Sequence, residues 1–186
     1  MAILLTFLFT FRVTVARQTV VDLQTSVNNS SVNNLLAEGR GKVLVLVFVR
    51  TDCPISNRYA PVLHQIQKQF AQAAIFRLVF PDKSEPPDKI RRYLREYGYD
   101  VPAIRDLNHT LAKRTMAKVT PEAAVFNQRG ELVYHGRIDN LYERIGQARR
   151  AATTHELADA IEAASKGASP PIASADAVGC FIADLE

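Results

Sequence analysis

Cysteine is scarce in this chain of 186 residues, which carries only Cys53 and Cys180. Two cysteines cannot build the disulfide framework that staples small secreted domains. They are enough for one redox pair, or for a nucleophile and its resolving partner. The histidines add no metal motif, because no two have metal-ligand spacing with each other or with a cysteine (His64, His109, His135 and His155). We therefore expect no metal site and no cofactor, with a soft-metal site of both thiols and one histidine as the alternative.

The sequence also lacks a long Lys/Arg run, an aromatic-basic platform, a phosphate-binding glycine loop and internal repeats. Its net charge of +4 is therefore not that of a nucleic-acid-binding surface, and we expect no nucleic-acid partner. Hydrophobic residues make up 47% and charged residues 23%, which is ordinary for a globular protein. The length fits one domain with appendages.

Residues 1–16 open with an apolar segment of about ten residues, too short to span a bilayer and suited to a secretion signal. No basic residue precedes this segment, so an uncleaved anchor near a membrane or a misassigned start are the alternatives. Export would place the protein in an oxidising compartment, periplasmic or otherwise extracytoplasmic.

The apolar run Val43 to Val49 predicts a strand buried on both faces. Pro54 suits the first turn of a helix, and the apolar residues that follow recur at spacings of three and four (Tyr59, Val62, Leu63, Ile66 and Phe70). Cys53 should therefore lie where a central strand ends and a helix begins.

A thiol at a helix N-terminus is pushed toward the thiolate, the form that attacks disulfides and peroxides or binds soft metals. Asp52 opposes this shift by its own negative charge, and Arg50 or Arg58 could offset it. The alternative is that Cys53 is an inert buried thiol.

Around this junction the sequence predicts a lead-in over 17–40, a domain over 41–167 and a tail over 168–186. Further strands are expected over 73–80, 123–127 and 132–137, and helices over 89–97, after Asp106 or Asn108, and after Thr153 to Glu156. The second of these helices should carry Leu111, Met116 and Val119. The last should turn an apolar stripe inward (Leu157, Ala160, Ile161 and Ala164). Tyr59 is expected in the core, with a place in the site as the alternative, and Arg137 with Asp139 should form a surface ion pair, with a place at the rim of the site as the alternative. The order predicts an α/β fold with a mixed central sheet of about four strands, combining a parallel βαβ unit with an antiparallel hairpin.

Cys53-Pro54-Ile55-Ser56 after the first core strand, and Thr120-Pro121 before the third, resemble the thioredoxin superfamily over about residues 40–166. The sequence is most similar to its redoxin branch, the alkyl hydroperoxide reductase and thiol-specific antioxidant group, and to exported thioredoxin-like proteins. The resemblance implies a thioredoxin-like fold, a reactive Cys53, and a cis Pro121 that lies beside it with Thr120 and binds substrate backbone. Pro54 would belong to the same binding surface.

The sequence departs from each subgroup at one position or more. Ser56 replaces the second cysteine of a CxxC motif, so dithiol exchange within the motif is impossible. Leu46 and Arg50 stand where peroxiredoxins have Pro and Thr, which argues against a peroxidase, and the nearest threonine is Thr51. Asn57 replaces the second thiolate of Sco-type copper chaperones.

Cys180 lies in the tail, and Pro170-Pro171 could extend the chain far enough to reach Cys53. Its interpretations are a resolving cysteine, a structural disulfide that closes a long loop, a free thiol packed beside Phe181 and Ile182, or a metal or intermolecular role. We therefore expect a thiol oxidoreductase with Cys53 as nucleophile, acting on a protein disulfide or a peroxide. A copper-binding or assembly protein and a non-redox interaction domain are the alternatives.

Overall fold

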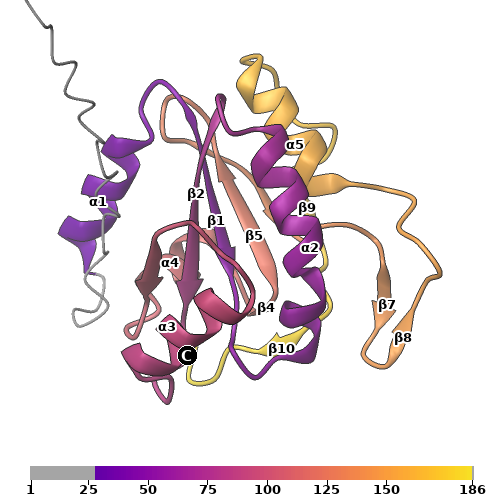
Figure 1. Cartoon of the computed structure of the whole chain (residues 1–186). Coiled ribbons are helices and arrows are strands. Elements are labelled where there is room, and N and C mark those ends of the chain that lie inside the picture. Colours follow the sequence, from indigo (N-terminus) through magenta and orange to yellow (C-terminus); the bar gives the residue numbers. More distant parts are fainter. Residues whose placement is uncertain (1–27, 186) are drawn as a thin grey trace, which may run out of the picture.

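The computed structural model describes residues 28–185 and consists of a mixed sheet between two layers of helices (Figure 1). The sheet has the order β3-β2-β1-β5-β6-β9, with β1 Val43–Phe48, β2 Ala74–Phe80, β3 Ala103–Arg105, β5 Glu122–Phe126, β6 Leu132–Gly136 and β9 Ser174–Ala175. Two small sheets join β4 Val119–Thr120 to β10 Cys180–Phe181, and β7 Tyr142–Arg144 to β8 Gln147–Ala148. The helices are α1 Asn29–Glu38, α2 Pro54–Gln69, α3 Pro87–Glu96, α4 Thr110–Thr115 and α5 Glu156–Ser165.

The predicted α/β class is confirmed, with a sheet of six strands rather than about four. One additional strand is β3, a short extended piece that pairs in parallel with β2. The other is β9, which the tail adds beside β6. Both strands are too short for an alternation of apolar and polar residues to be recognised in the sequence. The expected signal segment 1–16 and the start of the lead-in lie outside the described residues.

Strand β1 is the centre of the sheet, because all of its residues are buried and it pairs in parallel with β2 and antiparallel with β5. Side chains alternate between the two faces of a strand. Val43, Val45 and Val47 pack into the core cluster with α2, α3 and α5, whereas Leu44, Leu46 and Phe48 pack into the cluster with α1 and α4.

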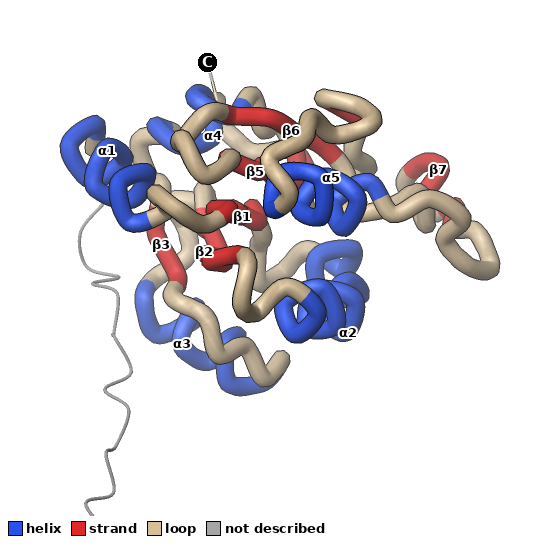
Figure 2. Tube along the Cα trace, turned by 90° about the horizontal axis from the view of Figure 1, so that it is seen from above, coloured by secondary structure: helices blue, strands red, loops and turns tan. Residues whose placement is uncertain are grey.

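The two helical layers therefore pack on opposite faces of the central strands, since β2 and β5 also place side chains in both clusters. Figure 2 shows α2, α3 and α5 on one side of the sheet and α1 and α4 on the other. The predicted inward stripe of the last helix is confirmed, since Leu157, Ala160, Ile161 and Ala164 are all buried. No helix among residues 28–185 is long and apolar enough to cross a membrane.

The helix expected after Asp106 is shorter than predicted. It ends at Thr115, where Met116 turns the backbone into the left-handed region with φ 61° and is 51% exposed. Val119 belongs to β4 instead. The Asp106 carboxylate does hold the start of this helix, because it accepts the N–H of Ala112 at 2.8 Å.

The tail is folded onto the domain at two places. Strand β9 aligns Ala175 with Gly136 of β6, and a Cβ on Gly136 would lie 2.0 Å from the Ala175 carbonyl oxygen. Glycine at 136, which has φ 139°, is therefore required for this approach. Farther on, β10 aligns Cys180 with Thr120 of β4.

Truncating the centre of β1 should destabilise the whole fold. Leu46 is 0% exposed, so Leu46→Ala removes buried contacts and should lower the free energy of unfolding by about 2 to 5 kcal/mol. Urea denaturation followed by circular dichroism measures this. The control Ile145→Ala, at a side chain that is 69% exposed, should stay within about 0.5 kcal/mol of the parent protein. Equal losses in both variants would contradict the central role of β1.

A candidate two-cysteine site

Cys53 lies at the end of the central strand, as the sequence predicted. It is the N-cap residue of α2 with an extended backbone, and Pro54 begins the helix. The side chain is 1% exposed, and its Sγ donates to the Thr120 carbonyl at 3.1 Å. The Thr120-Pro121 peptide bond is cis. The placement of Thr120 beside Cys53, which the family resemblance implied, is thus present in the structure.

The tail brings Cys180 directly to Cys53. The Cys180 thiol donates to the Cys53 sulfur at 2.8 Å, across 127 residues of chain, and both cysteines are free thiols. A disulfide bond requires about 2.05 Å between the two sulfurs, so a small movement would suffice for bond formation. Figure 1 shows the yellow β10 beside β4, close to the start of α2.

The two thiols are electrostatically different. Burial alone would raise the pKa of Cys53, but the Cys180 thiol and the backbone N–H and hydroxyl of Ser56 favour its thiolate, and the pKa lies below its ordinary value. Burial, followed by the neighbouring Cys53, raises the pKa of Cys180 to about 11. The two pKa shifts therefore have opposite directions, downward at Cys53 and upward at Cys180.

Ion pairs hold the loop before Cys53. The sequence indicated Arg50 and Asp52 as a compensating pair, but it did not indicate Asp82. Arg50 bonds Asp52 at 3.1 Å and also Asp82 at 3.0 Å, so the negative charge next to Cys53 is compensated. Thr51 donates its backbone N–H to Glu85, which is 0% exposed. Burial raises the pKa of Glu85 despite its hydrogen bonds from Thr51.

Asp82 and Glu85 were missed because they lie in the Pro-rich loop after β2, more than thirty residues from Arg50 in sequence. A buried acid in such a loop has no period or motif that would identify it. Only the parallel pairing of β1 with β2 brings the ends of the two strands together.

The expected surface ion pair between Arg137 and Asp139 is wrong. Asp139 is 4% exposed and accepts the hydroxyl of Tyr59, while Arg137 pairs with Glu156 on α5. Burial, with the Asp139 carboxylate, raises the pKa of Tyr59. The predicted core role of Tyr59 is confirmed by its 4% exposure.

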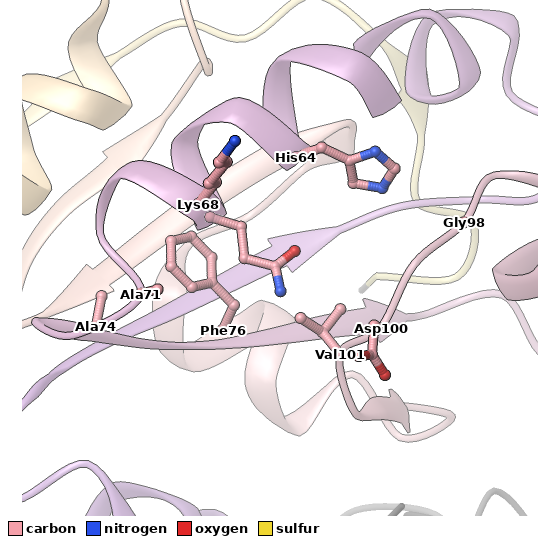
Figure 3. A pocket seen from close by; sticks show the side chains of 9 residues that line it. His64, Lys68, Ala71, Ala74, Phe76, Gly98, Asp100 and Val101 are labelled. Carbon is pink, nitrogen blue, oxygen red and sulfur yellow. The ribbon is translucent and has the colours of Figure 1, made fainter.

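Among residues 28–185, no histidine forms a hydrogen bond or ion pair with either thiol. Within residues 28–185 no group of three His, Cys, Asp or Glu side chains could hold a metal ion. His109 bonds the carbonyls of Pro81 and Asp184, and His135 lies 3.8 Å from Glu122. A hollow of about 360 Å³ has His64 and Lys68 of α2 and Phe76 of β2 in its lining (Figure 3). Neither cysteine lines it.

The comparisons with known proteins agree with this fold. Residues 41–132 match the model of a thioredoxin-like family. A hypothetical protein from Sinorhizobium meliloti 1021 superposes with a TM-score of 0.69 at 25% identity, covering 79% of this chain and 82% of the other. An uncharacterised conserved protein from Geobacillus kaustophilus gives 0.66 at 19% identity, covering 84% and 81%. Neither name states an activity, and no curated protein matches the chain.

The opposite pKa shifts of the two thiols should be separable by mutation. Cys180→Ala removes the hydrogen bond to the Cys53 sulfur and should raise the pKa of Cys53, whereas Cys180→Ser retains a donor and should raise it less. In Cys53→Ser the pKa of Cys180 should fall from about 11 but stay above its ordinary value, because burial remains. Thiolate ultraviolet absorbance against pH measures all three. An unchanged Cys53 titration in Cys180→Ala would contradict the assignment.

Proposed function

Because the chain carries a thioredoxin-like domain, we propose that it is a thiol–disulfide oxidoreductase with Cys53 as nucleophile and Cys180 as resolving cysteine. The observation that carries this proposal is the contact of 2.8 Å between two free thiols whose pKa values are shifted in opposite directions. A buried structural pair would need no such asymmetry. An attacking thiol and a protonated partner are what a two-step exchange requires.

In the first step the Cys53 thiolate attacks one sulfur of a partner's disulfide. That S–S bond breaks, a mixed disulfide forms with Cys53, and the released thiolate takes a proton. In the second step Cys180 gives up its proton and attacks the Cys53 sulfur, which expels the second partner thiol and forms the Cys53–Cys180 disulfide. The partner gains two electrons and the protein loses two. A dithiol reductant would restore the protein, and the reverse sequence would oxidise a partner.

Several features favour a protein disulfide over a peroxide as the substrate. Cys53 is 1% exposed and lies under an extended strand, a cover that a peptide chain can replace along the same edge. Leu46 and Arg50 occupy the positions of the peroxiredoxin Pro and Thr. Pro54 and Pro121 would flank the bound partner, Thr120 would face it, and the exported location expected from residues 1–16 would supply disulfide-bearing partners.

Substitution of the two cysteines should give different failures. Cys53→Ser should abolish reduction of a protein disulfide, measured as insulin reduction coupled to dithiothreitol, because no attacking thiol remains. Cys180→Ser should stop at the first step and accumulate a mixed disulfide on Cys53, seen by intact-mass spectrometry. Met116→Ser, at a side chain that is 51% exposed and takes no part in the site, is the control and should keep the parent rate.

Turnover that survives Cys53→Ser would refute the oxidoreductase proposal. If the parent protein instead binds one Cu(I) tightly and loses it in either cysteine variant, with no disulfide reduction, a metal-binding protein replaces it. Two adjacent thiols suit a soft cation as well as a redox couple.

A further inference from the structure

Strand β10 has the features of a bound peptide rather than of a core element. It consists of two residues, Cys180 and Phe181, and pairs with β4 alone. The Phe181 side chain is 75% exposed, whereas Cys180 is half-buried against Cys53. A short extended segment with a cysteine at the reactive sulfur is the arrangement that a substrate disulfide would need.

The edge that receives β10 is held by hydrogen bonds to Glu122 and offers a carbonyl group to the tail. Glu122, 5% exposed, accepts the N–H groups of both Lys118 and Val119. On the side facing the tail, the Lys118 carbonyl accepts the N–H of Ile182 at 2.9 Å. Thr120 adds its hydroxyl, which donates to the Cys180 carbonyl at 3.4 Å. Main-chain pairing of this kind binds an extended chain whatever its side chains are.

The residue before the cysteine meets a close steric limit. A Cβ on Gly179 would lie 2.2 Å from the Thr120 carbonyl oxygen and 2.6 Å from its carbon. Both are backbone atoms of the cis Thr120-Pro121 segment and cannot turn aside. A chain that lies along this edge therefore fits best with glycine immediately before its cysteine.

The residue two positions after the cysteine meets an apolar pocket. Ile182 is 6% exposed and belongs to the core cluster that contains Leu111, Ala112 and Ala117. Between these two positions Phe181 faces solvent, so the edge sets no requirement there. The pattern read from the tail is glycine, cysteine, any residue, and an aliphatic residue.

We propose that β10 is a tethered stand-in for the substrate, and that the partner is a protein whose disulfide cysteine lies in an extended Gly-Cys-x-aliphatic segment. This inference rests on the oxidoreductase function proposed above and names its substrate class. The partner segment replaces β10 on β4, its cysteine takes the place of Cys180, and the disulfide of that cysteine is presented to the Cys53 thiolate. After the mixed disulfide forms, the partner segment leaves β4 while its sulfur stays bonded to Cys53, and the tail returns with Cys180 to attack the Cys53 sulfur and release the partner thiol.

The tail can be opened by substitutions that leave Cys53 and β4 unchanged. In a full-length Cys180→Ser background, Gly179→Val places side-chain atoms against the Thr120 backbone and should expel β10. Alkylation of Cys53 by iodoacetamide should then speed up by about tenfold or more relative to Cys180→Ser alone. Phe181→Ser in the same background is the matched control and should leave the rate unchanged. Ile182→Asp is a second opening variant with the same expectation.

The opened protein, Gly179→Val with Cys180→Ser, is the receptor for the substrate test. Its probe is a peptide with the sequence of residues 177–184, carrying nitrothiobenzoate as a mixed disulfide on its cysteine. Cys53 attacks the peptide sulfur, forms a disulfide with it and releases coloured nitrothiobenzoate. Peptides with Val for the glycine or Asp for the isoleucine should react about tenfold or more slowly, whereas Ser for the phenylalanine should have no effect.

The outcomes separate this inference from the function on which it rests. Equal rates for all four peptides, or an alkylation rate that neither opening variant changes, would overturn the substrate inference while leaving Cys53 a competent nucleophile. If no peptide releases nitrothiobenzoate although alkylation shows Cys53 to be accessible, the oxidoreductase function itself fails.

Discussion

The burial of β1 on both faces is the constraint on which the rest of this molecule depends. Valines on one face of β1 and larger side chains on the other pack into the two cores, to which its neighbours β2 and β5 also contribute. Because its two neighbours run in opposite directions, the end of β1 meets the end of β2 and the beginning of β5. Cys53, the loop with Glu85, and the cis Thr120-Pro121 segment are therefore gathered at one edge of the sheet.

The site at this edge has a defined polarity. Hydrogen bonds from Cys180 and Ser56 lower the pKa of the Cys53 thiol, whereas burial and the neighbouring Cys53 raise that of Cys180. The arrangement differs from a CxxC motif, in which both thiols come from one helix turn. Here the second thiol comes from a distant strand, so its presence at the site depends on where the tail lies. The pKa of Cys53 consequently depends on the position of the tail that carries Cys180.

The sequence predicted the features that rest on strong local patterns. The Val-rich run, the Cys-Pro boundary and the spacing of apolar residues in α2 and α5 each follow from a simple period, and each was located correctly. The placement of Thr120 beside Cys53 came from the family resemblance, since 67 residues separate them.

Long-range polar partners and short paired segments could not be predicted in the same way. The packing of α5 and α2 against the sheet determines the partners of Arg137 and Asp139. The residues next to these two in the sequence do not indicate that packing. Met116 adopts a left-handed backbone that its side chain gives no reason to expect. Strands β9 and β10 are two residues long, and only pairing with an existing edge makes them strands. The contact between the two cysteines depends on both of these pairings.

The close approach of Ala175 to Gly136 has a consequence for the reach of Cys180. With β9 fixed in the sheet, Cys180 lies five positions after Ala175, and a chain of that length spans about 17 Å when fully extended. The thiol is thus confined to a small volume around Cys53 even when β10 is detached. Such a tether would keep the local concentration of the Cys180 thiol near Cys53 in the millimolar range, so in the proposed exchange an external thiol would compete poorly with Cys180.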